Sequence, residues 1–416
     1  MMRTMLQPVC CLISGLIALT LESAVYAQSA PPVRIYLDAA WTGATTSSDA
    51  IEQGIRTALD EVGNQLAGRP VELVVKDHHG NTRRSKSNLN EYLADEQALV
   101  VFAGLHSPPL VANRNFINEQ GILVLDPWAA AGPITRYPSP TNSIFRLSVD
   151  DLRAGPFLVA HTVKAHGSLK PALLLEETAW GLSSEKSMST ALSAQGLEPS
   201  TVKWFNWNLK PAGARILLRE IVESKADAII LVANATEGKV IAEAMADLPS
   251  DVRLPIISHW GITGGDFAQT IGPALRAEID LCFIQTRFSF ISDLDDTFGN
   301  AVFERAKKLF PDTIRSREDI HAPVGFIHAY DLTRILIAAV EQCGLSGEIR
   351  NDRVSVRDAL ENLQSPVQGL IKRYERPFCP YSEAMPDAHE ALTVSDYAMA
   401  YYGTNNEIRL IRRAEQ

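Results

Sequence analysis

The sequence predicts an α/β fold built from two doubly wound, Rossmann-like halves. From residue 33 onward, short apolar runs alternate with segments of helical periodicity. The same alternation starts again near residue 171, and 416 residues exceed what one ordinary core accommodates. Parallel strands joined by helices need helices on both faces of the sheet. We therefore expect two mainly parallel sheets, each covered on both sides.

Residues 1–27 have the pattern of a cleavable secretory signal. Arg3 precedes an apolar stretch at 9–21, and Val25, Tyr26 and Ala27 form a cleavage site. The apolar stretch is too short to span a bilayer stably, and we expect no membrane span later in the chain. The mature protein is therefore expected to be free in the periplasm, without a lipid anchor.

The charge of the chain narrows the kinds of partner that it can bind. Removal of the signal takes away one Arg and one Glu, so the formal net charge stays at −10. Because the phosphates of nucleic acids bind to a basic surface, we expect no nucleic-acid partner.

The cysteines are expected to differ in their surroundings. Cys282 lies in an apolar run and is expected to be a buried free thiol. Cys343 and Cys379 could pair in an oxidising compartment, but the sequence does not show that they meet.

The first half begins with alternating strands and helices. Helices are expected at 47–66, up to about 94 and up to about 120, between strands at 33–37, 71–75, 100–103, 122–125 and 143–148. Ser107 with Pro108 and Pro109 is an N-cap signal, and Gly121 occupies the position of a left-handed helix C-terminus. Because parallel strands present their carboxyl ends at one edge, the loops after 100–103 and 122–125 should be neighbours.

These residues also carry a resemblance. The order of strand, Gly104-x-x-Ser107, helix, a Gly-Ile-Leu strand and then Pro127 with small residues resembles the periplasmic Leu/Ile/Val-binding proteins of ABC importers. The resemblance implies the type I periplasmic binding protein fold, in which the serine and the residues after the proline hold an amino acid. Trp128 and Ala130 depart from the family, which has a small residue and a threonine there. This departure weakens the inference of an amino-acid ligand.

The second half repeats the pattern and ends in return crossings. Strands are expected at 171–175, 202–206, 228–232 and 255–258, and helices at 153–166, up to about 193, 212–224 and 237–246. Residues 281–285 indicate a return crossing, and 324–341 resemble a late helix of the family's first lobe. A third crossing is expected from Val367, followed by a hairpin of 397–402 and 408–411.

The predicted domains follow from these crossings. One lobe comprises residues 33–149 with 284–366, and the other 150–283 with 367–416. Three segments crossing side by side form a hinge, and the resemblance implies that the lobes close around a ligand.

Tryptophans define the expected ligand site. Trp41, Trp128, Trp180 and Trp260 each follow the carboxyl end of a predicted strand. In the resembled family these positions face the cleft, and Trp260 falls where an acidic residue meets the ligand's ammonium group. Indoles offer broad stacking surfaces, so we expect a flat, aromatic or largely apolar solute; a quaternary ammonium held by cation–π contact is the alternative.

The full set of predicted ligand-binding residues adds small and polar groups from the same loops. His106 and His259 could donate hydrogen bonds or simply be satisfied within their loops, and Trp204 and Trp207 are interpreted as packing residues on a strand. The set is Trp41, His106, Ser107, Trp128, Ala129, Ala130, Trp180, Asn234 and Trp260.

The predicted function is delivery of a small solute to an ABC permease by a monomeric periplasmic protein. A ligand sensor for a membrane receptor, or an amino-acid-binding protein with an altered pocket, remain alternatives. No enzyme is expected, because Gly261–Gly265 lacks the dinucleotide-binding spacing and Glu176 and Glu177 have no accompanying nucleophile. We also expect no cofactor and no metal site, since His78 and His79 are adjacent on an extended segment and point apart.

Overall fold

The computed structural model describes residues 1, 31–139 and 141–411. The predicted signal segment therefore lies outside the described residues, apart from Met1. The rest of the chain forms two lobes, each built on one mainly parallel sheet, as the sequence predicts.

The first lobe is a six-stranded sheet in the order β2-β3-β1-β4-β5-β6. All neighbours are parallel except β2 and β3, which form a hairpin. The strands are β1 (Val33–Ala39), β2 (Gln65–Leu66), β3 (Arg69–Asp77), β4 (Ala98–Ala103), β5 (Val124–Asp126) and β6 (Ile144–Arg146).

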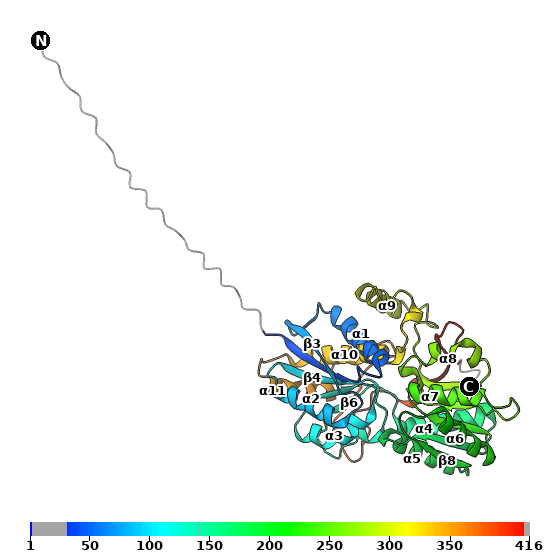
Figure 1. Cartoon of the computed structure of the whole chain (residues 1–416). Coiled ribbons are helices and arrows are strands. Elements are labelled where there is room, and N and C mark those ends of the chain that lie inside the picture. Colours follow the sequence, from blue (N-terminus) through cyan, green and yellow to red (C-terminus); the bar gives the residue numbers. More distant parts are fainter. Residues whose placement is uncertain (2–30, 140, 412–416) are drawn as a thin grey trace. The chain divides into compact units, whose positions relative to one another are not determined.

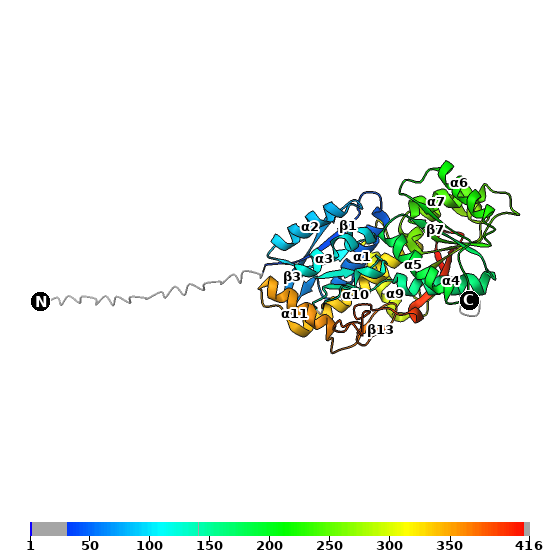
Figure 2. The same ribbon diagram turned by 90° about the horizontal axis from the view of Figure 1, so that it is seen from below.

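Helices cover both faces of this sheet. Helices α1 (Thr45–Asp60), α10 (Pro323–Cys343) and α11 (Ile349–Glu361) lie on one face, and α2 (Thr82–Ala94) and α3 (Ser107–Glu119) on the other (Figure 1). Figure 2 shows α2 and α11 on opposite sides of the strands. The alternation along β1 explains this, because Ile35 and Leu37 enter one apolar cluster and Tyr36 the other.

The second lobe has seven strands in the order β15-β14-β11-β10-β9-β7-β8. The last two strands in the sequence, β14 and β15, lie at one edge, where β14 is antiparallel to β11 and β15 is antiparallel to β14. The strands are β7 (Pro171–Glu176), β8 (Thr201–Phe205), β9 (Ala228–Val232), β10 (Ile256–Ser258), β11 (Leu281–Thr286), β14 (Tyr397–Tyr402) and β15 (Ile408–Leu410).

Helices α4 (Asp151–His166) and α5 (Ala179–Ser193) cover one face of the second sheet. The other face carries α6 (Pro211–Glu223), α7 (Ala235–Ala246) and α8 (Phe267–Arg276). Consecutive residues of β7 again divide between the two faces, since Leu173 and Leu174 belong to different clusters.

The chain passes between the lobes three times. It leaves the first sheet after β6, returns after β11 to form α9 (Thr297–Leu309) and α10, and enters the second sheet again at β14. The segment after Val367 first forms a separate hairpin of β12 (Val367–Gln368) and β13 (Arg373–Tyr374). The residue boundaries predicted for the two lobes stay a prediction.

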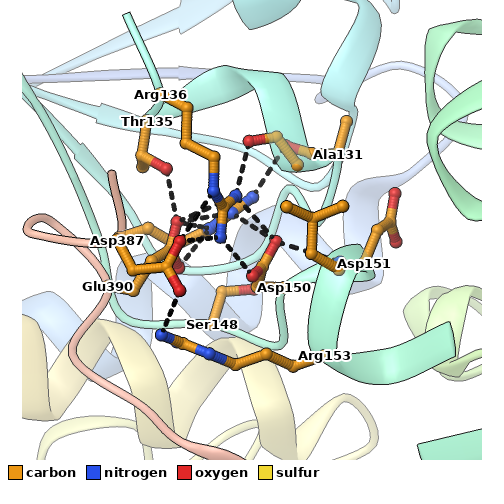
Figure 3. Close-up of polar contacts among 12 residues, drawn as sticks. Ala131, Thr135, Arg136, Ser148, Asp150, Asp151, Arg153, Asp387 and Glu390 are labelled. Carbon is orange, nitrogen blue, oxygen red and sulfur yellow. Dashed lines mark hydrogen bonds and ion pairs between the residues drawn. The ribbon is translucent and has the colours of Figure 1, made fainter. Parts of the chain in front are cut away.

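A buried ion-pair network joins the first and third crossings. Arg146, at the end of β6, is fully buried and pairs with Glu390 at 2.6 Å and Asp150 at 3.0 Å. Arg136 adds a second guanidinium, with Asp150 at 2.6 Å and Asp387 at 2.6 Å. Figure 3 shows these side chains converging from the two crossing segments. The network holds residues that are more than 230 positions apart in the sequence.

Some predicted elements differ in their bounds. The helix expected to reach residue 66 ends at Asp60, because Gly63, Asn64 and Gly68 take positive φ angles and turn the chain into the β2–β3 hairpin. The structure places His106 at the N-cap of α3, so Ser107 is its first helical residue. Helices α8, α9 and α11 were not predicted.

The structure shows the state of the three cysteines among the described residues. Cys282 is a buried free thiol, as expected, and Cys343 and Cys379 are also unpaired.

Among the described residues, α10 alone is long and apolar enough to cross a membrane by length and composition. That helix is 83% buried inside the fold, so it serves as a core helix.

Candidate functional site

A narrow pocket, with a cavity volume of about 10 Å³, lies between loops of the two lobes. The first lobe contributes loops after β4 and β5, and the second contributes loops after β7, β9 and β10, all at the carboxyl ends of the strands. The lining residues are Leu105, His106, Ser107, Pro108, Trp128, Ala130, Glu176, Trp180, Asn234, Trp260 and Gly261.

Most of the predicted ligand-binding residues are in this lining, and two are not. His106, Ser107, Trp128, Ala130, Trp180, Asn234 and Trp260 line the pocket. Trp41 packs against the core of the first lobe, and its backbone N–H donates to Asp77 Oδ1 at 3.0 Å. Ala129 faces the opposite apolar cluster. The placement in the lining is observed, whereas ligand binding by these residues stays a prediction.

Aromatic rings from both lobes meet at the pocket. The ring centroids of Trp128 and Trp260 are 6.2 Å apart in an edge-to-face arrangement, and Trp260 is 5.2 Å from His328. Trp180 stands perpendicular to His259 at 5.0 Å. Edge-to-face pairs at these distances are the favoured geometry for aromatic groups. The indoles are thus fixed by their neighbours.

Glycines make room for the indoles. A Cβ atom on Gly325 of α10 would lie 2.6 Å from the Trp128 ring, and one on Gly261 would lie 2.5 Å from the Trp180 ring. A Cβ on Gly264, in the second lobe, would lie 2.3 Å from Leu105 Cδ1 in the first. Contacts below 3.0 Å force a displacement. Gly325 and Gly261 therefore leave room for the indoles within their own lobes, and Gly264 permits the close approach of the two lobes.

The loop that carries Trp128 is held by its own backbone. Asp126 Oδ1 accepts hydrogen bonds from the N–H groups of Trp128 and Ala129 at 3.1 and 2.8 Å. His328 Nδ1 donates to the Pro127 carbonyl at 2.9 Å, and the Ser148 hydroxyl donates to that of Trp128 at 2.7 Å. The N–H groups of Trp128 and Ala129 are therefore already bound by Asp126 and are not open to a ligand.

Ser107 lies beside this loop. Its Oγ accepts a hydrogen bond from the Ala131 N–H at 3.2 Å, which leaves the hydroxyl proton as a donor. Position 107 at the first turn of α3 explains this geometry, since the side chain reaches the loop rather than capping its own helix.

Three ring nitrogens of lining residues have no protein partner within the described part of the chain. They are Nε1 of Trp128, Nε1 of Trp180 and Nδ1 of His106, and all three are buried. Burial lowers the pKa of His106 to about 3, so the ring is neutral. A buried indole N–H without an acceptor costs roughly 1–3 kcal/mol. The pocket therefore presents donors that a bound acceptor would satisfy.

Glu176 is a lining residue that the ligand-site prediction missed. Its carboxylate accepts from Asn234 Nδ2 at 2.9 Å and from Thr178 Oγ1 at 3.1 Å. Burial raises the pKa of Glu176 to about 7. Position 260 carries Trp where the resembled family has an acid, but the pocket still has an acidic group, because this carboxyl enters from β7. The feature of the sequence that could have indicated Glu176 is its position as the last residue of an apolar strand, at the edge where the binding loops gather.

A wider cavity of about 250 Å³ adjoins the pocket and shares His106 and Asn234 with it. Trp207 lines this cavity, and its ring lies 5.7 Å from that of His106. The interpretation of Trp207 as a packing residue on a strand is wrong, since β8 ends at Phe205 and the indole extends from the following turn. Trp207 also donates a hydrogen bond to Glu176.

Comparison with known proteins agrees with this architecture. Residues 39–377 match the sequence profile of the family described as periplasmic binding protein. The chain belongs to the periplasmic binding protein family. No curated protein matches the chain.

Solved structures give the same fold for this periplasmic binding protein. An ABC transporter solute-binding protein from R. palustris in complex with benzoate has a TM-score of 0.72 at 17% identity, covering 91% of this chain and 95% of that one. A second from Rhodopseudomonas palustris, in complex with p-hydroxybenzoic acid, has 0.72 at 16% identity with the same coverage. A leucine-binding protein from Thermotoga maritima has 0.67 at 14%, covering 91% and 98%. These likenesses place the chain in the type I periplasmic binding protein fold.

Proposed function

We propose that this protein binds a small aromatic carboxylate between its lobes in the periplasm and delivers it to an ABC importer. The observation that carries the proposal is the combination of indole rings with unpaired, buried N–H groups in one pocket. Rings favour a flat apolar body, and N–H groups favour an oxygen acceptor. An aromatic acid has both.

The donors come from both lobes. Trp128 and the Ser107 hydroxyl belong to the first lobe and Trp180 to the second, so a carboxylate held by them would link the lobes. Hydrogen bonds to a charged group contribute roughly 1.5–3 kcal/mol each. Such a bridge favours the closed form only when ligand is bound, which is the requirement for a delivery protein.

The charge of the pocket agrees with this ligand class. Since the pKa of Glu176 is about 7, a large share of its carboxyl groups are neutral near neutral pH and tolerate an anionic neighbour. The two R. palustris relatives with benzoate and p-hydroxybenzoic acid support the same class.

Calorimetry on the mature chain tests the proposal. Benzoate, 4-hydroxybenzoate, the neutral isostere benzamide and leucine are titrated in parallel. We expect micromolar binding of at least one aromatic acid, and binding of benzamide weaker by about 10-fold or more because one charge-assisted acceptor is lost. Leucine binding tighter than that of every aromatic acid would overturn the proposal and favour an amino-acid-binding protein.

Matched variants locate the donors. Trp180→Phe and Trp128→Phe keep an aromatic ring but remove the N–H group, and each is expected to weaken binding of the acid by about 10- to 100-fold. Trp204→Phe is the control, because Trp204 lies on β8 and is absent from the pocket lining. Equal losses in all three variants would contradict the assignment of the donors.

A further inference from the structure

Two histidines and a cysteine converge in the second lobe, away from the ligand pocket. His161 and His166 lie on the last turns of α4, and Cys282 is the second residue of β11. One ligand atom from each residue lies within 4.8 Å of the others. Cys282 and His161 are buried, and His166 is half-buried.

One separation matches that between two ligands of a tetrahedral metal, and the others are within 4.8 Å. His161 Nε2 is 3.6 Å from Cys282 Sγ. With a Zn–S bond of about 2.3 Å and a Zn–N bond of about 2.0 Å, tetrahedral ligands lie roughly 3.3–3.6 Å apart. The imidazole rings of His161 and His166 are 5.7 Å apart and steeply inclined, so both can direct a nitrogen to one point.

A fourth oxygen donor adjoins this cluster. Asp280 Oδ2 lies 3.5 Å from His166 Nδ1. Asp280 and Cys282 are two residues apart at the start of β11, so their side chains project from the same face of the sheet. The arrangement offers two nitrogens, one sulfur and one oxygen, which is a donor set suited to a borderline divalent cation.

We propose that His161, His166 and Cys282 bind one Zn²⁺ ion, with Asp280 or water in the fourth position. On binding, the Cys282 thiol gives its proton to solvent and its sulfur forms the bond to the metal. The expectation of no metal site rested on His78 and His79 alone. His161 and His166 form no recognisable metal motif with Cys282 in the sequence, because Cys282 is more than 100 residues further along the chain.

The position indicates a structural ion. The site is at the C-terminal end of α4, where the helix dipole favours a cation. The N-terminal end of α4 lies at Asp151, whose carboxylate meets His259 beside the ligand pocket. A 16-residue helix is roughly 24 Å long, so the metal is remote from the bound solute. It would fasten α4 to β11, the strand that precedes the second crossing.

Metal analysis of the mature chain tests the proposal. We expect one Zn²⁺ per chain after dialysis against excess zinc, a higher melting temperature with zinc than after chelation, and a thiolate-to-metal charge-transfer band when Co²⁺ replaces Zn²⁺. Cys282→Ser is expected to abolish the band, and His161→Gln to weaken zinc binding by about 100-fold. The chelated parent should still bind the solute.

Control variants separate this site from adventitious binding. Cys343→Ser and His321→Gln remove an exposed thiol and a histidine outside the cluster, and both should keep zinc and the cobalt band. Circular dichroism checks that each variant is folded. Absence of stoichiometric zinc in the folded parent, or a cobalt band that survives in Cys282→Ser, would overturn the proposal.

Discussion

Glu176 lines the pocket, and its burial changes how tightly its carboxyl group holds a proton. Its carboxyl accepts hydrogen bonds from Asn234 and Thr178, yet burial still raises its pKa to about 7. Desolvation thus outweighs the hydrogen bonds that favour the charged form. A carboxyl with this pKa can be neutral beside an anion and charged beside a cation.

The raised pKa predicts how stability depends on pH. The folded chain holds the Glu176 proton more tightly than the unfolded chain, so this group's contribution to stability is present at low pH and is lost as pH rises toward 7. Glu176→Gln removes that contribution. Between about pH 5 and pH 8, the variant should gain roughly 1–3 kcal/mol in free energy of unfolding relative to the parent.

Urea unfolding of both proteins at the two pH values measures this difference. Glu177→Gln is the matched control, because its side chain is exposed at the neighbouring position. A pH dependence that is the same in the parent and in Glu176→Gln would show that the carboxyl is not desolvated.

At the scale of elements, the loop after β5 depends on β6. Arg146 Nη1 donates to the carbonyls of Ala129 and Ala131 at 3.1 and 2.9 Å, while its other nitrogens pair with Glu390 and Asp150. The buried Arg146 guanidinium therefore holds the pocket loop and the crossing segments together.

Removing Arg146 should be costly. Arg146→Met leaves the buried Glu390 with only a 3.8 Å pair to Arg136, and Asp150 with Arg136 alone, so we expect a loss of up to about 3–5 kcal/mol in free energy of unfolding. Arg34→Met is the control, since that arginine is partly exposed and pairs with Glu72 and Asp95 at the surface, where ion pairs contribute about 0–1 kcal/mol. Chemical denaturation compares the two. Similar losses in both variants would contradict a special role for the buried network.

At the scale of the whole molecule, the lobes touch at the pocket. Trp128 meets Trp260, and the Gly132 N–H donates to Ser183 Oγ at 2.9 Å, each contact joining the two lobes. The three segments that cross between the lobes are the expected hinge.

Small-angle scattering should detect closure. We expect the radius of gyration to fall when a ligand verified by calorimetry is added. In Gly264→Leu the new side chain meets Leu105 of the other lobe and should reduce the contraction, whereas Gly213→Leu on α6 should not. A radius unchanged by a saturating ligand would count against the hinge.

The sequence by itself determined the alternation of strands and helices, the two sheets and the edge at which the binding loops gather. Apolar periodicity reports which side of each element is buried, and the carboxyl ends of parallel strands share one edge regardless of distant contacts. This is why the sequence alone predicts that Trp128, Trp180 and Trp260 lie together at one edge.

Only the tertiary structure decided which groups remain free at that edge. Asp126 accepts hydrogen bonds from the N–H groups of Trp128 and Ala129. Trp41 packs against the core, and the Glu176 carboxyl lines the pocket. Likewise, His161 and Cys282 meet although they are 121 residues apart. Such contacts depend on helix packing and strand order between distant segments, and local patterns carry no information about them.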